Sequence, residues 1–203
     1  MTTVTTFWIA RHGETGWNEE GRSLGHGDPP LNDRGREQAR MLARRLSEVR
    51  PAAVYASDLR RAAETGAIVA AGVGAPLRVV PALREVDLGE WTGLTDAEVA
   101  QRYPGALERW RSGRRAWRQG ESYDEMARRV VAALRRIGAA HPASRVAVVA
   151  HAGTAIAALA KARRMAFEEC RLAHPKPACS EVLVVELRAG AFSVPRRELV
   201  ETQ

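Results

Sequence analysis

Short apolar runs and amphipathic stretches alternate along the chain. Largely apolar or β-branched runs predict strands at residues 4–10, 53–56, 77–80 and 145–150, and later runs predict closing strands at 181–187 and 192–195. Elsewhere, apolar residues recur at the helical spacing i, i+3, i+4 and i+7, as in Ala39, Leu42, Ala43 and Leu46. Because strands alternate with helices, we predict an α/β protein with three α/β/α layers and a mostly parallel central sheet.

Polar caps and glycines mark where the helices are expected to begin and end. Asn32 or Asp33 is a suitable N-cap for one helix, and Ser57 opens the next. The loop before them, residues 13–30, is rich in glycine and proline and long enough to be functional. Further helices are predicted at residues 96–103, 107–110, 122–140 and 154–164.

The bulk composition fits one domain over residues 1–203. A chain of 203 residues with 45% hydrophobic and 27% charged residues can bury a core of its own. Residues 94–120 combine two short predicted helices with a polar, basic stretch. We therefore expect this segment to be a small helical cap inserted over one end of the sheet.

The net charge of +7 comes almost entirely from arginine, since the lysines are Lys161 and Lys176. Nucleic-acid binding, attraction of a small anionic substrate, or arginines spread over solvated helix faces would each explain this charge. Arginine doublets recur along predicted helices, aromatic residues make up 5%, and we find no nucleic-acid-binding motif, so no nucleic-acid partner is expected. Arg114, Arg115 and Arg118 in the cap could meet substrate anions, but a solvated face is favoured.

The sequence carries no clear targeting, membrane or metal signal. The apolar runs are too short to span a bilayer, and the first residues lack a basic region followed by a long apolar one. Cys170 and Cys179 make no disulfide framework, and no His, Cys or Asp cluster has metal-ligand spacing. These observations predict a cytoplasmic protein with free thiols, no membrane partner, no metal and no cofactor.

Polar groups follow three of the predicted strands. Arg11 and His12 come directly after the first strand, Ser57 after the second and His151 after the fourth. Ligands of open α/β sheets bind beyond the carboxyl ends of the strands, so these groups are expected to meet at one edge. Glu85, in the loop after the third strand, could join them. Taken alone, an Arg-His-Gly tripeptide is more often an ordinary polar loop.

Together these groups match what phosphoryl transfer through a histidine needs. A neutral imidazole attacks phosphorus, fixed cations stabilise the charge on the phosphoryl oxygens, and an acid protonates the leaving oxygen. His12 would be the nucleophile, with Arg11 and Arg61 as the cations. Glu85 would protonate the leaving oxygen and then activate water, and His151 would add a further contact. No metal is required where arginines stabilise the charge.

Residues 11–18, which read Arg-His-Gly-Glu-Thr-Gly-Trp-Asn, resemble the signature of the histidine phosphatase superfamily, which has the phosphoglycerate mutase-like fold. Later blocks resemble that family in the same order, at residues 25–39, 57–65, 83–93, 120–122 and 149–153. The resemblance covers nearly the whole chain. It implies the five roles given above and places the phosphate-binding arginine at Arg61 rather than Arg60.

The resemblance also implies contacts with the substrate. The positions are Arg11, Asn18, Leu24, Gly25, Arg61, His151 and Ala152, of which Asn18 matches a residue that touches the phosphate. Leu24 stands where relatives often carry a polar residue, so a hydrogen bond to substrate would be missing. Ala152 replaces a frequent glycine, and its methyl group could crowd the backbone or change the turn.

The resemblance alone leaves the reaction open. Mutases of the family usually carry a longer insertion after the acid block and a longer C-terminal tail. Here Gly93 and Ser122 lie close in sequence and few residues follow Pro195. This favours a metal-independent phosphomonoesterase acting on small phosphorylated metabolites through a phosphohistidine on His12.

Several alternatives remain open at this point. The protein could be a cofactor-dependent phosphoglycerate mutase, or specifically an alpha-ribazole phosphatase or a glucosyl-3-phosphoglycerate phosphatase. A basic binding module of weak activity is the alternative from another class. A homodimer paired through an apolar edge is also left open.

Overall fold

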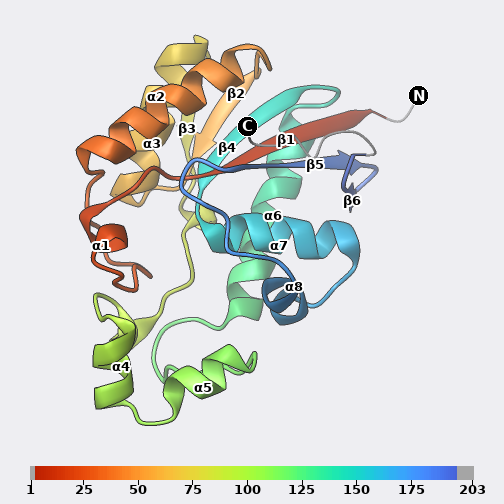
Figure 1. Ribbon diagram of the computed structural model, residues 1–203. Coiled ribbons are helices and arrows are strands. Elements are labelled where there is room, and N and C mark those ends of the chain that lie inside the picture. Colours follow the sequence, from red (N-terminus) through yellow and green to blue (C-terminus); the bar gives the residue numbers. More distant parts are fainter. Residues whose placement is uncertain (1–2, 196–203) are drawn as a thin grey trace.

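The predicted strands form one six-stranded sheet in the order β3-β2-β4-β1-β5-β6 (Figure 1). In the computed structural model, which describes residues 3–195, the strands are β1 (Val4–Arg11), β2 (Ala53–Ala56), β3 (Leu77–Val79), β4 (Arg145–Ala150), β5 (Val182–Arg188) and β6 (Ala191–Ser193). β1 to β4 run parallel, whereas β5 and β6 pair antiparallel. The mostly parallel sheet is therefore confirmed. In the sequence, the short segment after Pro195 is an argument against a mutase. That segment lies outside the described residues.

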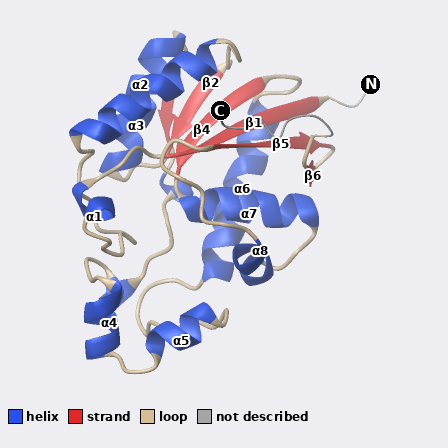
Figure 2. Ribbon diagram, in the orientation of Figure 1, coloured by secondary structure: helices blue, strands red, loops and turns tan. Residues whose placement is uncertain are grey.

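Helices cover both faces of this sheet (Figure 2). They are α1 (Gly16–Glu19), α2 (Asp33–Ser47), α3 (Arg60–Val73), α4 (Asp96–Arg102), α5 (Ala106–Arg111), α6 (Tyr123–Ala140), α7 (Ala152–Arg163) and α8 (Phe167–Ala173), with 3-10 turns at Pro81–Leu83 and Gly89–Trp91. α2 and α3 lie on one face, and α6 and α7 lie on the other with α8 beside them. The predicted three-layer arrangement is confirmed.

The central strand β4 shows why both faces need a cover. Val146, Val148 and Ala150 belong to the core beneath α6 and α7. Ala147 and Val149 belong to the core beneath α2 and α3, and all five residues are fully buried. Successive side chains of a strand point to opposite faces, so an uninterrupted apolar run is stable where helices cover both faces.

Capping residues set the starts of two long helices, and the sequence predicts the cap of the first. The Asn32 side chain accepts a hydrogen bond from Gly35 N (2.8 Å) at the start of α2. Ser122 and Glu125 form a capping box at the start of α6. Each cap satisfies an amide that the helix itself leaves without a partner.

Two predicted helix starts need correction, and the sequence pattern predicts neither α1, which lies within the expected loop 13–30, nor α8. α3 begins at Arg60 rather than Ser57, because Ser57 prolongs the extended segment and its amide donates to Val149 O (3.1 Å). α7 begins at Ala152, directly after the strand end, rather than at Thr154. α8 was not predicted, because it has 7 residues and buries only two side chains, too few for a periodic pattern.

The helices of residues 94–120, α4 and α5, lie apart from the sheet and its two helical layers, at the lower end of Figure 1. Aromatic packing joins this segment to the rest. The ring centroid of Trp117 lies 5.7 Å from that of Trp91 and 5.3 Å from that of Tyr123. Both tryptophans are buried. The position suits the predicted cap, although its role stays a prediction.

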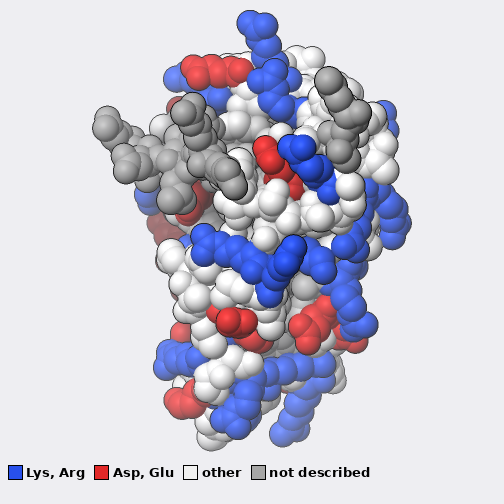
Figure 3. All heavy atoms as spheres, turned by 90° about the vertical axis from the view of Figure 1, so that its right-hand side faces the viewer, with Lys and Arg blue, Asp and Glu red and all other residues white. Residues whose placement is uncertain are grey.

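Charged side chains of both signs share the face shown in Figure 3. Lys and Arg side chains gather there in a band across the middle of the face, with acidic side chains above and below it. Arg114, Arg115 and Arg118 are exposed, and Arg115 donates to the carbonyl oxygen of Gly120 (3.0 Å). This arrangement supports the solvated-face interpretation of these arginines. Separately, within residues 3–195 no helix is long and apolar enough to cross a bilayer.

Candidate active site

The carboxyl ends of β1 and β4 open into a cavity of about 350 Å³. The predicted residues that line it are Arg11, His12, Asn18, Leu24, Gly25, Arg61, Glu85 and Ala152. His151 is the exception among the predicted residues. It is fully buried beside His12, with ring centroids 5.3 Å apart, and is not part of the cavity wall. Parallel strands bring their carboxyl ends to one edge, which is why residues distant in sequence meet here.

His12 is held in one orientation directly after β1. Its Nδ1 lies 2.7 Å from Gly13 O, and since a carbonyl only accepts, we assign the ring proton to Nδ1. Nε2 is then unprotonated and accepts a hydrogen bond from Arg61 Nε (3.2 Å). Burial, followed by the charges of Arg61 and Arg11, lowers the pKa of His12 well below its usual value. The imidazole is therefore neutral at neutral pH, with its lone pair on Nε2.

Arg61 is a fully buried cation fixed by backbone oxygens. Its Nη1 donates to Gly27 O (2.7 Å) and its Nη2 donates to Gly25 O (2.9 Å). Burial lowers the pKa of Arg61 to about 10, so the guanidinium stays charged at neutral pH. Thr65 Oγ1, one helical turn later, donates to Arg61 O (2.7 Å) and accepts from Gly13 N (3.0 Å). These bonds tie the start of α3 to the loop after β1.

Arg11 is the second buried cation of the site. Its Nη1 donates to Pro177 O (2.8 Å). Within the described range 3–195, neither Arg11 nor Arg61 has a carboxylate at ion-pair distance. Carbonyl oxygens orient a guanidinium without neutralising it, so both charges remain for an anion.

His151 occupies the N-cap position of α7. Neither of its ring nitrogens has a hydrogen-bond partner among the residues that the structure describes, 3–195. Burial, followed by the charge of Arg61, lowers the pKa of His151 well below its usual value, so this imidazole is also neutral. Buried nitrogens without a partner are rare in proteins, and here they point to a ligand atom beside His12.

Glu85 enters the cavity from the loop after β3. Its Oε2 accepts a hydrogen bond from Gly153 N (3.1 Å), and its Oε1 accepts one from Val86 N (2.9 Å). The first contact places the carboxyl group at the positive end of α7. A Cβ atom at position 153 would collide with Oε1 of Glu85, so only glycine leaves room for this contact.

Arg129 of α6 was missed in the sequence, although it holds the Glu85 loop. Its Nη1 donates to Arg84 O (2.6 Å) and its Nη2 donates to Glu85 O (2.7 Å). Glu121 pairs with the same guanidinium at 2.6 Å. In the linear pattern Arg129 does not differ from its exposed neighbour Arg128, so only the tertiary contact identifies it.

The other predicted substrate positions form one part of the cavity wall. Asn18 Oδ1 accepts from the backbone amide (3.2 Å) and the hydroxyl (3.0 Å) of Thr15, which fixes its side chain. Gly25 lines the cavity with a carbonyl bound to a guanidinium, and Leu24 adds an apolar side chain. Ala152 is the first residue of α7, so a regular helix start accommodates its methyl group.

Over residues 3–195, no group of three or more His, Cys, Asp or Glu side chains could hold a metal ion. The positively charged side chains that line the cavity are Arg11, Arg22, Arg61, Arg171 and Lys176.

A sequence profile decides the family. The profile of the histidine phosphatase superfamily (branch 1) matches residues 7–197. The chain belongs to this superfamily. The resemblance found in the sequence is therefore confirmed, and the match covers all the blocks that carried it.

Two Arabidopsis thaliana proteins and one solved structure illustrate the relationship. Phosphoglycerate mutase-like protein 4 is 44% identical over 151 residues, which are 71% of this chain and 65% of the relative. A metal-independent phosphoserine phosphatase is 40% identical over 155 residues, which are 74% of this chain and 65% of the relative. The match thus spans less than two thirds of either plant protein. A mycobacterial glucosyl-3-phosphoglycerate phosphatase shares the fold with a TM-score of 0.81 and 30% identity over 90% of both chains.

Proposed function

We propose that this superfamily member is a metal-independent phosphomonoesterase that hydrolyses small phosphorylated metabolites through a phosphohistidine on His12. The observation that carries the proposal is the neutral imidazole of His12, with Nδ1 bound to Gly13 O and Nε2 against the Arg61 guanidinium. A nucleophilic nitrogen beside an uncompensated cation attracts an anionic phosphoryl group and is oriented to attack it.

The reaction proceeds in two balanced steps. Nε2 of His12 attacks phosphorus while the bond to the leaving oxygen breaks, and protonated Glu85 gives its proton to that oxygen, so that an alcohol departs. The Glu85 carboxylate then takes a proton from water as the water oxygen attacks phosphorus. The P–N bond breaks, and inorganic phosphate, neutral His12 and protonated Glu85 result.

The remaining groups bind the phosphoryl oxygens. Arg11 and Arg61 hold the non-bridging oxygens and stabilise the charge that develops on them. One ring N–H of His151 donates to the same group, which satisfies a nitrogen that is otherwise without a partner. The side-chain NH₂ group of Asn18, which also lines the cavity, is a further donor.

The names of the relatives support a small phosphate ester as the substrate. One is a phosphoserine phosphatase and another a glucosyl-3-phosphoglycerate phosphatase. A cavity of about 350 Å³ suits a molecule of metabolite size. Asp96 and Trp110 line it from residues 94–120, which supports this segment as a cap over the non-phosphate end of the substrate.

The decisive experiment combines turnover with trapping of the intermediate. The wild type is expected to hydrolyse an aryl phosphate in the presence of a chelator, and brief exposure to labelled substrate should leave label on the protein. His12→Ala should lose both signals, whereas His141→Gln, at the C-terminal end of α6, should keep both. Turnover that survives in His12→Ala would contradict the proposal.

A mutase is the second candidate, because one of the relatives, 44% identical, is named phosphoglycerate mutase-like. Conversion of 3-phosphoglycerate to 2-phosphoglycerate, dependent on added bisphosphoglycerate and faster than release of inorganic phosphate, would favour it. The proposed phosphatase should release phosphate without forming the isomer.

A further inference from the structure

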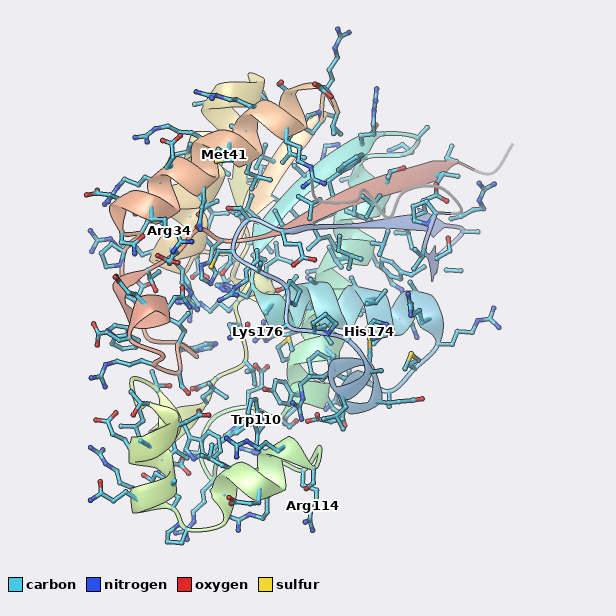
Figure 4. All side chains as sticks on the ribbon, viewed as in Figure 1. Arg34, Met41, Trp110, Arg114, His174 and Lys176 are labelled. Carbon is cyan, nitrogen blue, oxygen red and sulfur yellow. The ribbon has the colours of Figure 1, made fainter. Side chains whose placement is uncertain are left out.

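The cavity continues beyond the groups assigned to the phosphoryl oxygens. Its outer wall comes from α5, α6, α8 and the segment between α8 and β5. Trp110, Tyr123 and Phe167 give this wall an aromatic surface, and Arg171 and Lys176 add positive charge. In Figure 4 Lys176 lies between the sheet edge and Trp110. The outer wall is therefore suited to a short substrate that carries a charged group.

Two of the outer cations are already paired with carboxylates. Arg22 binds Glu20 (2.6 Å) and Glu98 (3.0 Å). Arg171 binds Glu168 (2.6 Å), and its guanidinium carbon lies 5.0 Å from the ring centroid of Trp110. Both arginines thus have structural partners that hold them in the wall.

Lys176 differs from these arginines. Its side chain is exposed to the open cavity, and none of the ion pairs within residues 3–195 includes it. The surrounding protein nevertheless desolvates the ammonium group, and this burial, followed by the charge of Arg11, lowers the pKa of Lys176. Two cations that repel each other beside an open cavity form a suitable site for an anion.

Hydrogen bonds fix the segment that carries Lys176 to the catalytic edge. Arg11 Nη1 donates to Pro177 O (2.8 Å), directly after Lys176. Two backbone bonds follow, from Ser180 N to Arg11 O (3.0 Å) and from Arg11 N to Glu181 O (3.1 Å). Lys176 is therefore held at a set position relative to Arg11 rather than on a free loop.

We propose that Lys176 binds a carboxylate of the substrate, so that the preferred substrates are phosphomonoesters of small hydroxy acids and amino acids. The inference rests on the proposed phosphatase function. The phosphoryl group already has Arg11, Arg61 and His151, whereas Lys176 stands on the side wall that leads to the cap. A single ammonium group matches the single charge of a carboxylate better than the double charge of a second phosphate.

Matched substrate pairs measure this contact directly. 3-Phosphoglycerate carries a carboxylate where glycerol 3-phosphate carries a hydroxymethyl group. Phosphoserine carries a carboxylate where phosphoethanolamine carries a hydrogen atom. For the wild type, kcat/KM should favour the carboxylated member of each pair by about tenfold or more, because a charge-assisted hydrogen bond is gained.

Variants then assign the preference to one residue. In Lys176→Met, the ratio of kcat/KM for the carboxylated ester to kcat/KM for its partner should fall close to one in each pair. At the same time, kcat/KM for glycerol 3-phosphate should change less than about threefold. Lys176→Arg should retain most of the ratio. Lys161→Met is the matched control, because it removes the other lysine, which is exposed near the end of α7 and does not line the cavity.

Three results would overturn the inference while leaving the phosphatase proposal intact. The first is a wild type with equal kcat/KM for both members of each pair. The second is a ratio of these kcat/KM values that Lys176→Met leaves unchanged. The third is an equal loss of kcat/KM for both members of a pair in Lys176→Met, which would assign Lys176 to the phosphoryl group. A wild type that hydrolyses none of the esters would instead contradict the phosphatase proposal. Calorimetric binding of 3-phosphoglycerate to His12→Ala, with and without Lys176→Met, would then judge the Lys176 contact without turnover.

Discussion

The inner and outer sides of the cavity are built by different means. On the inner side, Arg11, His12 and Arg61 are at most 8% exposed, and backbone carbonyl oxygens orient them. On the outer side, Trp110 and Lys176 are more accessible to solvent, and Trp110 Nε1 donates to the side-chain hydroxyl of Tyr123 (3.2 Å). Backbone groups are present whatever the side chains are, whereas side-chain contacts change with each substitution.

This difference separates the reaction from its specificity. Burial keeps the imidazoles neutral and leaves the guanidinium charges poorly screened, which are conditions for phosphoryl transfer to any suitable ester. The outer wall offers an aromatic surface and one cation without an ion-pair partner in residues 3–195, which are conditions for selecting among esters. Substitutions on the inner side should therefore change the rate, and those on the outer side should change the preference.

Replacing an inner cation should have the largest effect. Arg61→Met removes one fixed cation and should lower kcat/KM by roughly 10²- to 10³-fold for every phosphomonoester. It also leaves Gly25 O and Gly27 O without their donor, at a cost of about 1–3 kcal/mol in the free energy of unfolding. Steady-state kinetics and denaturant titration measure the two effects. Arg60→Met, on the exposed neighbour, is the control, and activity within threefold of the wild type in Arg61→Met would contradict the assignment.

The next effect should depend on the leaving group. Glu85→Gln cannot protonate the departing oxygen, so hydrolysis of an alkyl phosphate should slow by roughly 10²-fold. An aryl phosphate, whose leaving group needs little protonation, should slow less in the first step. Rates for a series of esters measure this dependence, with the exposed Glu108→Gln as control. An equal fall in the hydrolysis rate for every ester of the series would contradict the assignment of Glu85 as the general acid.

The buried imidazoles should make stability depend on pH. Because the pKa values of His12 and His151 are lowered in the folded state, the unfolded chain binds more protons once the pH falls below about 6.5, the usual pKa of histidine. The free energy of unfolding should then fall with decreasing pH, by up to about 1.4 kcal/mol per pH unit for each histidine.

Denaturant titrations between pH 7.5 and 5 would measure this slope. His151→Gln should make this slope shallower than in the wild type. A slope that stays the same in His151→Gln would show that this imidazole is not buried in its neutral form.

The smallest effect is expected on the outer wall. Trp110→Ala removes aromatic surface from the cavity and the ring beneath Arg171, so KM should rise about three- to tenfold while kcat changes little. Full kinetic curves for a carboxylated ester measure the effects on KM and on kcat separately. Leu172→Ala, on α8 but outside the cavity, is the matched control. A large fall in kcat would mean that Trp110 belongs with the inner groups.

Much of the site could be predicted because it follows short, local patterns. His12 and His151 each come directly after an apolar strand, and parallel strands place such positions at one edge. Arg129 and Lys176 could not be predicted in this way. Arg129 acts on backbone oxygens of residues more than 40 positions earlier, and the position of Lys176 depends on bonds between its segment and Arg11.

The sequence by itself determined the strands, the longer helices and the set of groups for phosphoryl transfer, because periodicity, capping and strand-end positions are local properties. Only the tertiary structure decided which nitrogen of His12 is free, how Arg61 is held and which cation remains available to a substrate. These properties depend on burial and on hydrogen bonds between segments that are distant in the chain, and no local pattern carries that information.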